Sequence, residues 1–239
     1  RSTYQWGYDF SRTPWFAMGT PGQGTLDFLP APRRDYTAFE IGAEGAWQGV
    51  RYRASYVLSR TWGNYAGLYS SDISYGNPGM NIALFMAEQA PNSSGLLPND
   101  RTHVVKVSAA YTFGFGLEAG AFLTAASGSP INAFAPGDFG PGTPTFVVPR
   151  GSAGRTPALW NVDLRLAYTL PLRRGPRSRV VMDVLRLGNP RRATVVDELL
   201  AYKYYTIFGL GPADANPNYG RPTAYQAPMA ARLGLEISF

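Results

Sequence analysis

The side chains that most often carry out catalysis are scarce in this chain. Its 239 residues include no cysteine and one histidine, His103. A single imidazole without a thiolate leaves neither a conventional Ser-His-Asp arrangement nor the ligand set of a typical zinc site. The alternating residues around His103 instead predict that it lies near the end of a strand. We therefore expect no enzymatic activity, no bound metal and no cofactor.

The other short motifs that suggest a ligand have simpler structural explanations. Residues 114–116 (GFG) and 209–211 (GLG) resemble glycine-rich phosphate loops, but neither lies between a buried parallel strand and a helix. Four loop carboxylates lack the close spacing of a calcium-binding loop. They are Asp72, Asp100, Asp138 and Asp214. We interpret the glycines as turn residues and the carboxylates as solvated loop residues.

The chain is basic, with a formal net charge of +6. Basic chains often bind nucleic acid, so the placement of arginine matters. The arginines are scattered, and the densest group lies in residues 171–179 (PLRRGPRSR), whose proline and glycine predict a solvated hairpin tip. We therefore expect no nucleic-acid partner.

Charged residues of both signs occur at alternating positions in several segments. Alternation of polar and apolar residues with period two is typical of a strand with one wet face. Opposite charges on neighbouring strands then form cross-strand ion pairs. These charged residues could line a path for a substrate. We prefer the interpretation that they form a network of ion pairs, which keeps a polar wall rigid and hydrated. The charged residues assigned to this inward, lumen-facing side are Glu40, Glu44, Arg51, Arg53, Lys106, Glu118, Asp163, Arg165, Asp183, Arg232 and Glu236.

Seven segments have the alternation expected of such strands. They span residues 36–47, 50–60, 102–113, 117–127, 158–170, 179–187 and 228–239. Residues 4–10 alternate in the same way and suggest an eighth strand, and residues 80–88 suggest a short helix. Arg186 is a misfit, because it shares the parity of the apolar side chains in its segment. We expect it at the strand end, where its long side chain reaches polar surroundings.

The second face of these segments is apolar and rich in aromatic residues. This composition suits contact with lipid, because an Arg or Lys at the bilayer midplane costs about 2–4 kcal/mol. No stretch approaches the roughly 18 apolar residues of a membrane helix, so any membrane crossing must use strands. Aromatic residues gather where such strands meet the membrane surface. Those assigned to the lipid-facing girdles are Trp47, Tyr52, Tyr56, Tyr111, Trp160 and Tyr168.

The connections between the predicted strands alternate in length. Tight turns alternate with long Gly- and Pro-rich excursions at residues 62–100, 127–157 and 188–227. Outer-membrane barrels have this asymmetry, with short periplasmic turns and long extracellular loops. We therefore predict an all-β, antiparallel transmembrane β-barrel in the outer membrane. The last strand carries the pattern that we interpret as an assembly signal, formed by Leu233, Leu235, Ile237 and Phe239.

Five segments, in order, resemble the TonB-dependent outer-membrane transporters, specifically the Oar-like group with a carboxypeptidase-regulatory-like domain. They are residues 54–72, 97–111, 160–170, 182–198 and 219–239. The resemblance implies a 22-stranded barrel plugged by an N-terminal domain. Such a protein is a receptor and transporter that takes up a scarce ligand across the outer membrane. Residues 1–239 would then be the C-terminal seven or eight strands of one barrel domain, without the plug and the earlier strands.

The resemblance also implies the partners of the whole protein. They are outer-membrane lipid, the barrel-assembly machinery, TonB acting through the missing N-terminal part, and a small-molecule or peptide ligand. The three long excursions would form the outer vestibule and contact the ligand. No individual substrate-binding residue is predicted.

Three other interpretations fit parts of the pattern. A complete eight-stranded outer-membrane barrel with a structural or adhesion role becomes possible if residues 4–10 supply the eighth strand. A barrel-based lipase or protease would need a catalytic partner for His103. A water-soluble β domain explains the alternation but not the separation of long and short connections.

Overall fold

The computed structural model describes residues 3–7, 15–67, 90–137, 140–171, 177–188, 191–202 and 214–238. Within these ranges the chain is all-β, with antiparallel pairing in every sheet and a single 3-10 turn, η1 (Gly24–Leu26). The same ranges contain no helix that is long and apolar enough to cross a membrane. The short helix expected at residues 80–88 lies outside them.

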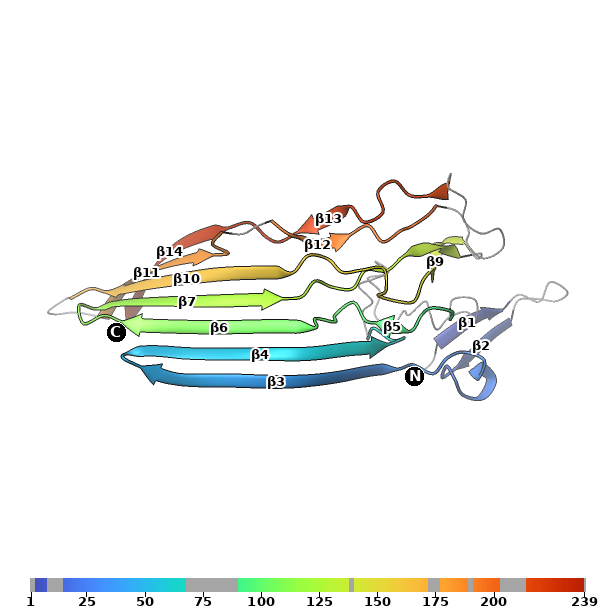
Figure 1. Cartoon of the computed structure of the whole chain (residues 1–239), viewed down its shortest axis with the longest axis horizontal. Helices are drawn as coiled ribbons and strands as arrows, with labels where there is room; N and C mark the ends of the chain where they lie inside the picture. The colour runs from blue at the N-terminus through green and yellow to red at the C-terminus, as the bar shows by residue number, and fades with distance from the viewer. Residues whose placement is uncertain are drawn as a thin grey trace.

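Seven long strands form one large sheet, in which neighbours in space are also neighbours in sequence (Figure 1). All seven strands predicted from the alternation are therefore confirmed. The two-residue strand β5 (Gly95–Leu96) extends this sheet beside the end of β4. The order from one edge to the other is β14 (Ala230–Ser238), β11 (Arg177–Leu185), β10 (Leu159–Thr169), β7 (Leu117–Ala126), β6 (His103–Thr112), β4 (Val50–Gly63) and β3 (Arg34–Trp47).

The hairpin of β3 and β4 shows how local sequence fixes the register. The strands pair without interruption from Arg34 opposite Gly63 to Trp47 opposite Val50. Gln48 and Gly49 form the connection, with φ angles of 48° and 84°. Positive φ at both central residues is the requirement of a type I′ turn, whose twist matches that of the paired strands.

The short and long connections lie at opposite ends of the sheet (Figure 1). The turns after β3 and β6, together with the C-terminal ends of β10 and β14, lie at one end, which we call the turn end. The described parts of the long connections lie at the other, which we call the loop end. They contain two small hairpins, β8 (Phe134–Gly137) with β9 (Gly140–Phe146) and β12 (Ala193–Val196) with β13 (Pro222–Tyr225).

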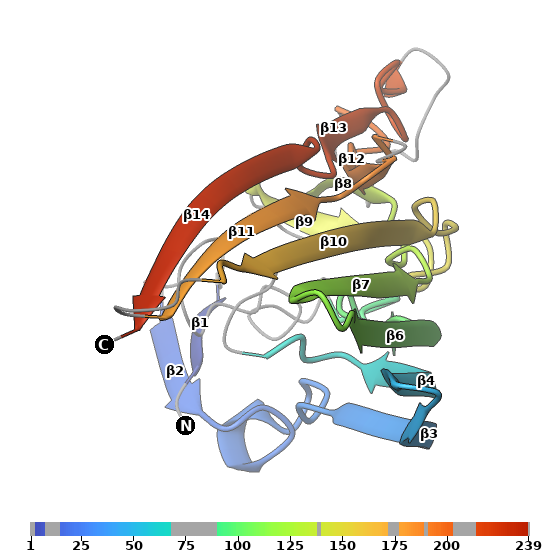
Figure 2. The ribbon, with the colours of Figure 1, turned by 90° about the vertical axis from the view of Figure 1, so that its left-hand side faces the viewer.

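The large sheet is curved but open among the described residues (Figure 2). Its edge strands, β14 and β3, have no second neighbour and are exposed along their whole length. The buried side chains instead gather in the connections. The largest fully buried ones are Arg150, Leu26, Leu29, Leu97, Asp100 and Ser93. In the part of the chain that the structure describes, no hydrophobic layer packs against the sheet in the way that it does in a soluble sandwich.

The expected N-terminal strand forms, but it does not join the large sheet. β1 (Thr3–Gly7) pairs with β2 (Trp15–Gly19) in a separate two-stranded sheet. The prediction missed β2, a partner only a few residues away that β1 reaches at a small loop-closure cost. A strand at residues 4–10 therefore does not supply the eighth strand of a closed barrel in the described structure.

The turn geometry predicts that Gly49→Ala destabilises the hairpin. An added Cβ would lie 2.9 Å from the Tyr111 ring, and the left-handed backbone conformation costs a non-glycine residue about 1–2 kcal/mol. We expect the free energy of unfolding, measured by urea titration, to fall by at least that amount. Gly114→Ala is the matched control, because nothing lies within 4 Å of its added Cβ. Equal effects of the two substitutions would contradict the turn assignment.

Candidate functional site

The register of the large sheet places the eleven charged residues of the predicted lumen set on one face, which we call the charged face. Arg165, Asp183 and Arg232, for example, lie side by side on β10, β11 and β14. The six aromatic residues assigned to the girdles lie on the opposite face, as do Leu233, Leu235 and Ile237. We call it the apolar face. Phe239 lies outside the described residues.

Seven side chains form a continuous ion-pair chain near the turn end of the charged face. Asp183 is only 6% exposed and lies 2.6 Å from Arg232 and 3.5 Å from Arg165. Arg165 continues to Glu236 at 2.9 Å. Arg179 lies 3.9 Å from Glu236 and 3.0 Å from Glu118, which is 3.9 Å from Arg51. The chain alternates in sign and links β14, β11, β10, β7 and β4.

Arg179 belongs to this chain but was absent from the predicted set. The sequence interpretation counted it both in the basic turn and as the first residue of the predicted strand 179–187, whereas β11 begins at Arg177. Its alternation with Asp183 could have identified it, because both residues occupy odd positions of β11. Its half-buried position beside two carboxylates shows that the basic segment is not wholly a solvated tip.

Arg186 departs from the strand that was expected to contain it. β11 ends at Leu185, and Arg186 has a φ of 58°. Its backbone N–H donates to Asp163 Oδ1 at 2.7 Å, and its Nε donates to the Pro228 carbonyl at 2.7 Å. Because Arg186 lies beyond the end of β11, the alternation of that strand does not apply to it. Asp163, predicted among the lumen charges, holds this turn.

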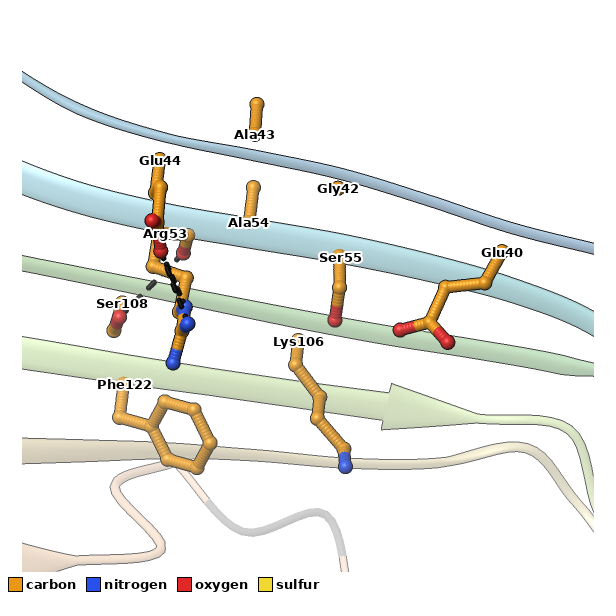
Figure 3. Close-up of a pocket in the computed structure, with 10 residues that line it drawn as sticks. All are labelled: Glu40, Gly42, Ala43, Glu44, Arg53, Ala54, Ser55, Lys106, Ser108 and Phe122. Carbon is orange, nitrogen blue, oxygen red and sulfur yellow. Dashed lines mark hydrogen bonds and ion pairs between the residues drawn. The ribbon is translucent and has the colours of Figure 1, made fainter.

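The middle of the charged face is hollow over β3, β4 and β6, with a volume of about 550 Å³ (Figure 3). Glu44 and Arg53 pair there at 3.0 Å. Lys106 and Glu40 project on the same side as Ser55, while Ala43 and Ala54 project to the other side, as the alternation requires (Figure 3). The hollow is a polar surface with charges of both signs.

The apolar face is uncovered across the seven strands. Its histidine, His103, is the first residue of β6, where Nδ1 lies 2.8 Å from the Tyr56 hydroxyl. The His103 backbone N–H donates to Ser127 Oγ at 3.1 Å, and no serine or carboxylate among the described residues bonds to the imidazole ring. The large exposed side chains on this face are Phe39, Ile41, Trp47, Tyr52, Leu58, Val107, Leu166, Tyr168, Met182, Leu233, Leu235 and Ile237.

The long connections pack into one unit, which we call the loop assembly, through buried polar groups. Asp100 is fully buried, accepts the Thr61 backbone N–H at 2.6 Å and lies 2.5 Å from Arg155. Arg150 is 2% exposed, donates to the Asn64 carbonyl at 3.1 Å and lies over the Phe146 ring. These contacts join the first long connection to the second. Asp100 is therefore not the solvated loop carboxylate that the sequence predicted.

A second buried cluster joins the second connection to the third. The backbone N–H and Nδ2 of Asn132 donate to the Glu198 carboxylate at 3.1 and 3.0 Å. The Gly151 N–H donates to Asn132 Oδ1 at 2.7 Å, and the Tyr219 hydroxyl donates to the Asn132 carbonyl at 3.2 Å. Burial, and then the charge of Glu198, raise the pKa of Tyr219. The hydroxyl therefore keeps its proton and its donor role at neutral pH.

A cavity of about 760 Å³ lies within the loop assembly. Burial, and then the neighbouring charge of Arg155, lower the pKa of Arg101, which donates to the Ser127 carbonyl at 2.9 Å. Its guanidinium nevertheless stays charged at neutral pH. The lining comes from all three long connections and combines proline, hydroxyl, aliphatic and charged groups. It consists of Pro98, Arg101, Ser129, Pro130, Phe134, Pro144, Thr156, Thr194, Val195, Val196, Asp197, Glu198, Leu199 and Thr223.

Comparisons with known proteins agree with this arrangement. No family model and no solved structure matches the chain. A curated protein described as the TonB-dependent transporter Oar of Myxococcus xanthus is 27% identical over 261 residues. The resemblance to a TonB-dependent transporter is confirmed. The match covers 94% of this chain and 24% of Oar, so the chain spans about a quarter of the length of that relative.

The loop assembly predicts unequal effects for two aspartates. Asp100→Ala leaves the Arg155 charge and the buried Thr61 amide without their acceptor, so we expect the free energy of unfolding to fall by about 3 kcal/mol or more. Asp35→Ala removes an exposed pair with Arg33 and should cost less than about 1 kcal/mol. Urea unfolding of both variants measures the difference. Similar losses would contradict the structural role of Asp100.

Proposed function

We propose that this chain is the C-terminal part of the barrel of a TonB-dependent receptor and transporter. In this proposal the complete protein lies in the outer membrane and takes up a scarce small-molecule or peptide ligand. The similarity to Oar over nearly the whole chain supports the class of protein. The apolar face of the sheet supports its location.

The observation that carries the proposal is an extended, uncovered apolar face opposite a charged one. Leu233 is 77% exposed and Trp47 69% exposed, and similar side chains continue across the strands between them. A soluble monomer rarely exposes so continuous an apolar surface. In hydrocarbon the same surface is favourable, and the charged face then turns toward an aqueous or protein-filled interior.

The open edges support a longer barrel. β3 and β14 leave backbone donors and acceptors unpaired along one side, which is unfavourable in lipid because no water satisfies them there. Further strands of the same protein would pair with both edges and close the barrel. A 22-stranded barrel has this requirement, whereas the complete eight-stranded barrel lacks its eighth strand in the described sheet.

The loop assembly is the best candidate for ligand contact. In the proposed orientation it lies at the outer surface, and its cavity draws on all three long connections. Its buried polar contacts hold those connections in place before a ligand arrives, which reduces the ordering cost of binding. The cavity combines neutral and charged groups and therefore suits a polar organic ligand or peptide.

The remaining partners act on other parts of the protein. We propose that the barrel-assembly machinery recognises the terminal strand through Leu233, Leu235, Ile237 and Phe239, and that TonB engages the N-terminal part of the complete protein. We propose no enzymatic role and no cofactor. Among the described residues, His103 contacts Tyr56 on the apolar face rather than a catalytic group.

Paired cysteine substitutions test the location of the two faces. Val107 and Ser108 are adjacent in β6 but belong to the apolar and charged faces, and the chain itself contains no cysteine. In outer membranes containing the cysteine-free full-length protein, Val107→Cys should react with a lipid-soluble maleimide and resist a water-soluble thiosulfonate. Ser108→Cys should show the reverse preference.

One labelling result would contradict the proposed contact between the apolar face and lipid. If the water-soluble reagent modifies Val107→Cys as fast as it modifies a cysteine placed at exposed Asn218, the apolar face does not contact lipid. Recovery of the protein in the soluble fraction would lead to the same conclusion.

A further inference from the structure

A hollow of about 730 Å³ lies at the loop end of β11 and β14, on the border of the apolar face. Its lining consists of Gly188, Arg191, Tyr225, Gln226, Pro228 and Met229. Gly188 lies against Trp160, which belongs to the apolar face, since a Cβ added at Gly188 would be 3.7 Å from the Trp160 ring. Met229 is 56% exposed and extends the apolar surface to the edge of the hollow.

Two arginines of the connection that follows β11 lie at this hollow: Arg191 lines it, and Arg186 bonds to a residue that lines it. The guanidinium of Arg191 lies over the Tyr225 ring, 5.2 Å from its centroid. The Nε of Arg186 donates to the carbonyl of Pro228, a lining residue, at 2.7 Å. The bond from the Arg186 backbone N–H to Asp163 fixes the turn that presents this side chain.

The local charge is positive. None of the lining residues is acidic. Arg192, the next residue after Arg191, donates to the Ala158 carbonyl at 2.9 Å. The guanidinium groups of Arg186 and Arg192 thus donate to backbone carbonyls, which carry no formal charge. Asp163 contacts the backbone of Arg186 from the charged face of the sheet.

We propose that this hollow binds the phosphate of an anionic lipid in the outer leaflet, with Arg186 and Arg191 as the phosphate ligands. The inference rests on the proposed membrane location, in which the loop end faces outward. Guanidinium groups bind phosphate strongly and with defined geometry. The adjoining Met229 and Trp160 offer an apolar surface for the acyl chains of the same molecule. Charge and hydrophobicity meet here at the depth where a lipid headgroup joins its chains.

Lipid binding to the detergent-solubilised full-length protein tests the proposal. The probes are bisphosphorylated lipid A, the same lipid without its phosphates, and sodium phosphate as a competitor. We expect the double variant Arg186→Gln/Arg191→Gln to weaken lipid A binding by about fivefold for each arginine removed, since one such charge near an anionic membrane surface contributes about 1 kcal/mol. The dephosphorylated lipid should bind wild type and double variant equally.

Two further variants separate charge from structure. Arg191→Lys keeps the charge and should bind lipid A more tightly than Arg191→Gln does, whereas a purely structural role for the stacked guanidinium predicts equal losses. Arg51→Gln removes an exposed arginine from the charged face and should leave lipid A binding unchanged.

The following outcomes would contradict the proposed phosphate site. Equal binding of lipid A by wild type and double variant, or an equal loss in Arg51→Gln, would exclude a specific phosphate site. Displacement of lipid A by millimolar sodium phosphate would indicate a site for free phosphate instead. The cysteine-labelling result at Val107 and Ser108 distinguishes the two proposals, because a correct labelling pattern without a lipid effect refutes only the lipid site.

Discussion

The structure depends on one constraint: among the described residues, no second layer of protein covers the apolar face of the large sheet. A sheet in water must cover that face, and its strands then tolerate occasional departures from strict alternation. Here all eleven predicted charged residues lie on the other face, and the side that carries Leu233 and Trp47 remains apolar across the sheet. The strict period of two in the sequence corresponds to this separation of a charged face from an apolar one.

Most of the charges on the charged face are paired with neighbours of opposite sign. Seven residues from Arg232 to Arg51 alternate in sign, and the most buried carboxylate, Asp183, has two arginine neighbours. Exposed pairs such as Glu44 with Arg53 contribute little to stability on their own. The network gives each of its charges at least one neighbour of opposite sign. Its members also orient one another across five strands.

Much of the sheet could be predicted from the sequence, because strand alternation and turn residues are local signals. Gln48-Gly49 indicates a turn by its residue types and its place between two alternating segments. Arg179 was missed although its parity was visible, because proline and glycine nearby suggested a turn. β2 was missed because its segment WFAMG has no clear alternation. The loop assembly was beyond prediction, since its contacts, such as Asn132 with Glu198, join residues 66 positions apart.

The contacts among the three long connections restrict which of them can change independently. Arg150, Asp100 and Asn132 each bond to a connection other than their own. Transplanting a single connection from a homologue would break these bonds and leave a buried charge without its partner. Substitutions at cavity-lining residues that make none of these bonds, or exchange of all three connections together, would disturb the loop assembly less than exchange of one connection alone.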